Sequence, residues 1–153
     1  MPTFSPINSS DPINEIIKSA FDMEVSLSGG WGYTQESATV IHSTNNLPAN
    51  QFEHTLATMR AYIEMNMTLV EEERYGSINP NETHREEVVL NHKTYHKVSY
   101  EVTGMKEDIY AGFINQYKKG YGTPEFDMSE HFKQRKAATL HRNVIHWFLE
   151  DFV

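Results

Sequence analysis

The sequence predicts an α+β domain in which an antiparallel sheet of about four strands, arranged as two β-hairpins, is packed by three or four helices. Residues 23–27 and 96–102 alternate apolar and polar side chains, which is typical of half-buried strands. Residues 52–70 and 132–148 repeat apolar side chains at the spacing of an amphipathic helix. Because no linker separates the two halves of the chain, we expect one domain over residues 11–153.

The N-terminal part is expected to form an arm, a helix and a first hairpin. Residues 1–10 contain two prolines and several small polar side chains, which predict a flexible arm. Asp11 and Pro12 predict a helix start, with Asp11 as the N-cap residue. The strand at 23–27 leads into a glycine turn, and residues 38–41 predict the returning strand.

A second helix is predicted from Asn50 onward. Asn50 and Glu53 match the pattern of a capping box, in which the two side chains satisfy free backbone N–H groups at a helix start. We place Glu53, Arg60 and Glu64 on the polar side of this helix, opposite its apolar stripe. The stripe consists of Phe52, Leu56, Met59, Ile63, Met67 and Val70.

The C-terminal half predicts a second hairpin. Residues 76–81 are expected to form a loop, 86–90 a strand and 91–93 a turn. The returning strand at 96–102 is expected to end at Gly104.

Two helices are predicted after this hairpin. Apolar residues repeat at helical spacing over 109–117, and Asp127 and Glu130 form a second capping-box pattern. The resulting order is α-ββα-ββα-α, which suggests a ββα pseudo-repeat. The inner face of the long last helix is predicted to carry Phe132, Ala137, Leu140, Val144, Trp147 and Phe148.

Composition excludes several classes of function. The chain of 153 residues has no cysteine, which rules out disulfides, cysteine-ligated metals and thiol nucleophiles. The N-terminus lacks the basic and apolar regions of a secretory signal, and no stretch approaches the length of a membrane span. We therefore expect a cytoplasmic protein with no membrane partner.

Charge is unevenly distributed along the chain. The formal net charge is −8, and residues 1–76 supply −7 of it. Residues 118–142 carry six bases against three acids, which makes them a candidate basic surface. The overall acidity disfavours nucleic acid as a partner. The candidate residues of this surface are Lys133, Arg135, Lys136 and Arg142.

The segment 28–33 is the most unusual in the chain. Three glycines and two aromatic residues at a hairpin tip are able to cradle a ligand, because glycine lets backbone N–H groups approach closely. The alternative is a tight turn with a tryptophan packed on the sheet. The candidate ligand-binding residues are Gly30, Trp31, Tyr33, His96 and Tyr100.

Eight histidines suggest metal binding, but their spacing does not. His92 and His96 fall on a predicted turn and strand, and His141 and His146 fall on different faces of a predicted helix. No phosphate-binding loop, nucleophile elbow or zinc-protease motif is present. The sequence therefore predicts no metal, no cofactor and no catalytic residues.

These observations favour a non-enzymatic binding or accessory protein that acts as a homodimer or binds another protein. The dimer hypothesis rests on the apolar stripe at 52–70 and on Trp147 and Phe148. An alternative is a small hydrolase or isomerase that uses His/Glu acid–base chemistry, with or without a metal. A third hypothesis is a nucleic-acid-associated protein that uses the basic surface at 118–142.

Overall fold

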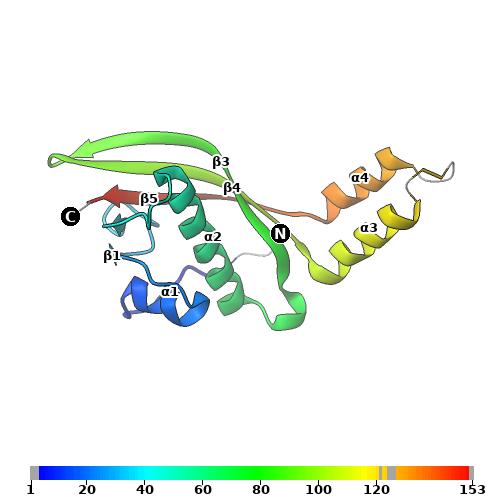
Figure 1. Ribbon diagram of the computed structural model, residues 1–153, viewed down its shortest axis with the longest axis horizontal. Helices are drawn as coiled ribbons and strands as arrows, with labels where there is room; N and C mark the ends of the chain where they lie inside the picture. Colours follow the sequence, from blue (N-terminus) through cyan, green and yellow to red (C-terminus); the bar gives the residue numbers. More distant parts are fainter. Residues whose placement is uncertain (1–3, 121, 124–126, 152–153) are drawn as a thin grey trace.

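The computed structural model describes residues 4–120, 122–123 and 127–151. It confirms the α+β class, with four α-helices and one five-stranded sheet in the strand order β1-β2-β5-β4-β3 (Figure 1). The sheet is mixed, since β2 and β5 are parallel and the other neighbours are antiparallel. The predicted four-stranded antiparallel sheet is therefore corrected to five mixed strands.

The N-terminal half contains two helices and the short first hairpin. Helix α1 spans Ile13–Phe21, and α2 spans Ala49–Thr68. Strands β1 (Leu27–Gly29) and β2 (Thr39–Ile41) form the predicted hairpin, although they are only three residues long. A 3-10 helix, η1, follows α2 at Glu71–Glu73.

The C-terminal half contains the long strands. Strand β3 spans Tyr75–Leu90 and β4 spans Lys93–Lys106, and they form the second predicted hairpin. Helices α3 (Glu107–Gly120) and α4 (Met128–Ala138) follow, and β5 (Leu140–Glu150) returns to the sheet between β2 and β4. The hairpin of α3 and α4 stands away from the rest of the molecule (Figure 1).

The predicted last helix is wrong beyond Ala138, where β5 begins. Its apolar positions fit a helix, but Val144, Ile145, Trp147 and Phe148 are also strong strand formers. Leu140, His146 and Phe148 lie on one face of β5 and are buried, and pairing with both β2 and β4 satisfies its backbone. The cap at the start of α4 is confirmed, because the Glu130 N–H donates to Asp127 Oδ1 over 3.1 Å.

The two hairpins do not form a repeat. The first has strands of three residues and the second has strands of sixteen and fourteen. The last described element, β5, is a strand parallel to β2, so the observed order differs from α-ββα-ββα-α.

Residues 76–81 and Gly104 belong to the second hairpin rather than to loops. Pro80 is tolerated within β3 because this is an edge strand. Gly104 lies within β4, and a Cβ there would lie 2.7 Å from Ile78 Cδ1. Glycine therefore permits close packing at this position and does not end the strand.

The predicted N-caps of α1 and α2 are also wrong. Pro12 and Pro48 flank the two helix starts, and neither helix has a side-chain cap. Proline has no N–H to satisfy and its fixed φ suits a helix start, which explains why these helices begin without Asp11 or Asn50 as cap.

The core lies between α2 and one face of the sheet, with the stripe residues Phe52, Leu56, Met59 and Ile63 buried in it. Phe4 and Ile7 of the N-terminal segment are also buried there. None of the described helices has enough consecutive apolar residues to cross a membrane.

Candidate functional site

Three charged side chains of α2 are buried, contrary to the prediction that they face solvent. Glu53, Arg60 and Glu64 are 0%, 2% and 3% exposed. At about 100° per residue they lie roughly 90° from the middle of the apolar stripe, so they flank it and are not opposite to it. Each charge meets polar partners from another part of the chain, which offsets the cost of its burial.

Glu53 forms the centre of one cluster, which we call the Glu53 cluster. Its Oε1 lies 2.9 Å from Arg85 Nη1, and its Oε2 lies 3.1 Å from His96 Nδ1. Glu150 Oε1 lies 3.8 Å from the same His96 nitrogen. Arg85 Nη2 donates to Glu82 Oε1 over 2.6 Å. This hydrogen bond is the largest cause of a raised pKa for Arg85, which therefore stays charged.

The sheet register brings these side chains together. His96 pairs with Phe148 across β4 and β5, so Glu150 two residues later lies on the same face. Arg85 lies on β3, where it pairs with Val98 of β4. The first turns of α2 place Glu53 over this face of the sheet.

A pocket of about 440 Å³ adjoins the Glu53 cluster. The Tyr100 hydroxyl is buried and makes no hydrogen bond within the described part of the chain. Burial, followed by the negative charge of Glu53, raises the pKa of Tyr100, so its phenol stays protonated. The residues lining the pocket are Asn50, Gln51, His54, Thr55, Glu82 and Tyr100.

Arg60 holds the predicted glycine turn against the sheet. Its Nη1 donates to the Trp31 carbonyl over 3.1 Å, and its Nη2 donates to the Ile145 carbonyl over 2.9 Å. Its guanidinium lies 4.7 Å from the centroid of the Tyr33 ring. Burial lowers the pKa of Arg60, while the Glu64 carboxylate raises it.

Glu64 joins the N-terminal segment to the same network. The Tyr33 hydroxyl donates to Glu64 Oε2 over 2.6 Å and accepts the Ile7 N–H over 2.9 Å. Burial is the largest cause of the raised pKa of Tyr33, and the hydrogen bond to Glu64 adds to it. Arg142 Nη1 lies 3.5 Å from Glu64 Oε1.

The glycines of the segment 28–33 are in contact with neighbouring backbone and side chains. A Cβ at Gly30 would lie 2.7 Å from the Ser37 carbonyl oxygen, and one at Gly32 would collide with the His146 imidazole. The Trp147 N–H donates to the Gly32 carbonyl over 2.8 Å. Trp31 is buried, so this geometry matches the packed turn that we considered as the alternative to a ligand cradle.

The five candidate ligand-binding residues therefore lie in two places. Gly30, Trp31 and Tyr33 lie beside Arg60, whereas His96 and Tyr100 lie at the Glu53 end of α2. Arg60 is seven residues along the helix from Glu53, which corresponds to about 10 Å.

The histidines do not gather in one cleft. Among the described residues, His54 lines the pocket and His96 contacts Glu53, but His141 pairs with Glu101 over 3.4 Å on the opposite face of the sheet. His92 lies in the turn between β3 and β4, and His131 packs edge-on against Phe113 between α3 and α4.

The candidate basic surface is divided between two elements. Lys133 is exposed on α4, whereas Arg142 lies on β5 with its guanidinium 4.3 Å from the centroid of the Phe4 ring. Arg135 and Lys136 belong to α4, but their side chains lie outside the described part of the structure. Arg142 therefore helps to hold the N-terminal segment instead of extending the surface of α4.

Sequence reasoning missed Glu53, Arg85 and Glu150 as site residues. One signal in the sequence did point to Glu53. Glu53, Arg60 and Glu64 recur at helical spacing along the edge of the apolar stripe, where side chains are partly covered. Arg85 and Glu150 carry no comparable signal, because only the strand order brings them to α2. Comparison with family models, with curated proteins and with solved structures found no match for the chain.

Proposed function

We propose that this chain is a non-enzymatic binding or accessory protein that acts as a homodimer. The observation that carries the proposal is the α3–α4 hairpin, which projects from the body as a separate arm (Figure 1). Its helices have 14 and 11 residues, and helices of this length depend on packing against other elements for stability. Ile109 and Tyr117 remain more than one third exposed along it.

A second copy of the chain offers a complementary surface, which we call the acidic groove. This groove of about 790 Å³ lies between the end of α2 and the start of β3, and its charged lining residues are Glu71, Glu72 and Arg74. Met67 and Val70, which are 54% and 60% exposed, lie at the same end of α2. Acidic and apolar side chains therefore occur together on this surface.

The hairpin has the matching chemistry. Lys118 and Lys119 are exposed in the last turn of α3, close in sequence to Tyr117. Seating the hairpin of each copy in the acidic groove of the other would pair opposite charges and bury apolar side chains. Two such contacts related by a twofold axis form a closed dimer.

The structure corrects part of the sequence evidence for a dimer, which was the apolar stripe at 52–70 with Trp147 and Phe148. Phe52, Leu56, Met59 and Ile63 are core residues, so most of the α2 stripe is unavailable to a partner. Phe148 is also buried. The proposal therefore rests on the hairpin and the acidic groove.

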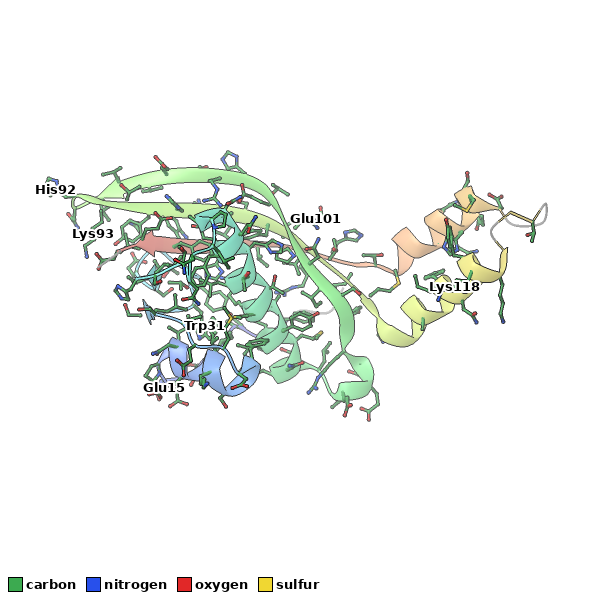
Figure 2. The ribbon with its side chains drawn as sticks, in the orientation of Figure 1. Glu15, Trp31, His92, Lys93, Glu101 and Lys118 are labelled. Carbon is green, nitrogen blue, oxygen red and sulfur yellow. The ribbon has the colours of Figure 1, made fainter. Side chains whose placement is uncertain are left out.

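Light scattering of the full chain at tens of micromolar tests the proposal. We expect a dimer for the native protein and a monomer for the double variant Lys118→Glu with Lys119→Glu. The control is Lys18→Glu with Lys93→Glu, which changes the net charge equally; Figure 2 shows Lys93 at the far end of the molecule from Lys118. Combining the hairpin variant with Glu71→Lys and Glu72→Lys should restore the dimer. A native protein that is monomeric throughout would refute the proposal.

The acid–base enzyme stays a second candidate because of one observation. His96 lies 3.1 Å from the buried carboxylate of Glu53, beside a pocket that His54 and Tyr100 also line. Hydrolysis of a panel of ester and phosphoester substrates that disappears in His96→Gln would favour this candidate. The same loss in His141→Gln would count against it, because His141 lies on the other face of the sheet.

A further inference from the structure

Three potential metal ligands of the Glu53 cluster lie close enough together to share one ion after small side-chain movements. One ligand atom from each of Glu53, His96 and Glu150 can be chosen so that all three lie within 4.8 Å of one another. The individual distances are 3.1 Å from His96 Nδ1 to Glu53 Oε2 and 3.8 Å to Glu150 Oε1. Tetrahedral ligands at about 2.1 Å from a zinc ion are about 3.4 Å apart, so small side-chain rotations would suffice.

We propose that Glu53, His96 and Glu150 bind a divalent transition-metal ion between α2, β4 and β5. Imidazole and carboxylate together suit zinc or manganese, and magnesium is disfavoured because it prefers oxygen ligands alone. The ion would join the first turns of α2 to two central strands of the sheet. His96 and Glu150 are partly exposed, which leaves a path for the ion to enter.

The charges around the cluster favour a cation. Glu53 is fully buried, and Glu82, Glu87 and Glu150 surround the same position. The Arg85 guanidinium contacts two of these four carboxylates, those of Glu53 and Glu82. Glu53 and the partly exposed Glu150 approach the same His96 nitrogen, and a divalent ion there would remove the repulsion between their carboxylates.

Second contacts hold the ligands in the orientation that a metal needs. Arg85 contacts Glu53 Oε1, which leaves Oε2 directed at His96, and Glu82 in turn holds Arg85. His96 presents Nδ1 to the two carboxylates, while its Nε2 lies 3.9 Å from Glu87 Oε1. In metal sites the second nitrogen of a ligating histidine usually donates to a carboxylate, a role that Glu87 would fill only after moving closer than its 3.9 Å.

A simple hydrogen bond from the Nδ1–H of His96 to Glu53 is the competing explanation. It requires one carboxylate, whereas the structure brings Glu150 to the same nitrogen as well. The two explanations differ in their dependence on Glu150, whose side chain is 26% exposed and is replaceable without opening the core.

Zinc titration of the chelator-treated full chain by calorimetry tests the site. We expect one ion per chain, with affinity at least tenfold weaker in Glu150→Gln and in His96→Gln. The matched control is His141→Gln, which removes a histidine that faces Glu101 at 3.4 Å on the same two strands but on the opposite face. Its affinity should equal that of the native chain.

A thermal melt supplies the second readout. Zinc should raise the midpoint of the native chain and of His141→Gln, and leave that of Glu150→Gln unchanged. Circular dichroism confirms that each variant is folded, and Glu150→Gln alone suffices should His96→Gln fail to fold. Absence of zinc binding, native affinity in Glu150→Gln, or an equal loss in His141→Gln would each overturn the proposal.

Discussion

Acid should destabilise this protein through His146, a fully buried histidine in β5. The Thr39 hydroxyl donates its proton to the Gly30 carbonyl over 2.8 Å, so it accepts a hydrogen bond from His146 Nε2 over 3.0 Å. His146 Nδ1 is then unprotonated, and it is buried without a hydrogen-bond partner among the described residues. The ring stacks on Phe148 with centroids 4.0 Å apart.

A second proton on this imidazole would create a buried charge with nothing to pair it. Burial is the main cause that lowers the pKa of His146 well below its ordinary value, and the nearby Arg60 charge adds to it. Above about pH 6.5 His146 is neutral in the folded and the unfolded chain, so it causes no pH dependence. Below that pH the unfolded chain binds a proton that the folded chain excludes, and stability falls.

This pH dependence of the free energy of unfolding comes from the single proton that His146 binds in the unfolded chain. Below pH 6.5 the free energy of unfolding should fall with pH, with a limiting slope for one excluded proton of about 1.4 kcal/mol per pH unit. Replacing His146 with Gln removes the titration while keeping an N–H donor for Thr39. The loss of stability below pH 6.5 should therefore be smaller in the variant than in the native chain.

Urea unfolding followed by tryptophan fluorescence at several pH values measures the difference. Other groups titrate in the same range, so the informative quantity is the native stability minus that of His146→Gln at each pH. His141→Gln is the matched control, because it removes an exposed histidine from the same strand. Parallel pH profiles for the native chain and His146→Gln would refute the reasoning.

Two further predictions concern the same network. Gly32→Ala should destabilise the protein by more than about 2 kcal/mol in urea unfolding, because φ is +76° and the new methyl group would collide with His146. Gly112→Ala is its control on α3, where nothing lies near a Cβ, and it should stabilise by about 0.5–1 kcal/mol. Tyr33→Phe should cost about 1–3 kcal/mol, since buried Glu64 loses a 2.6 Å hydrogen bond; an unchanged thermal midpoint would contradict this.

Local patterns predicted the elements whose neighbours in space are also neighbours in sequence. The apolar stripe predicted helix α2, and the alternation of apolar and polar residues predicted strand β4. The turn at 91–93 was also found, and Asn91 and His92 adopt positive φ there. The polar flank of α2 was misplaced because its burial depends on two distant segments, the glycine turn and β5, that cover its side.

Strand β5 shows why periodicity alone was insufficient. Leu140, Val144 and Trp147 fit a helical repeat, while Leu140, His146 and Phe148 fit the alternation of a strand. Counting His146 as polar concealed the second pattern. Pairing with β2 and β4 decided the outcome, and these strands lie far from β5 in the sequence.

The Glu53 cluster was beyond sequence reasoning for a related reason. Its members come from α2, β3, β4 and β5, and insertion of β5 beside β4 is what brings Glu150 to His96. A single sequence contains the residue types but not this strand order. Sequence spacing identifies metal ligands when they lie on the same helix, strand or loop. Here each proposed ligand lies on a different element.

The three buried charges of α2 have a shared consequence for the fold. Glu53 binds the strands, Arg60 binds the glycine turn and Glu64 binds the N-terminal segment through Tyr33. Sliding the helix by one turn would separate all three charges from their partners. Buried charges contribute little net stability against apolar replacements, but they penalise such alternatives strongly. We infer that this row sets the position of α2 on the sheet, and with it the meeting of Glu53, His96 and Glu150.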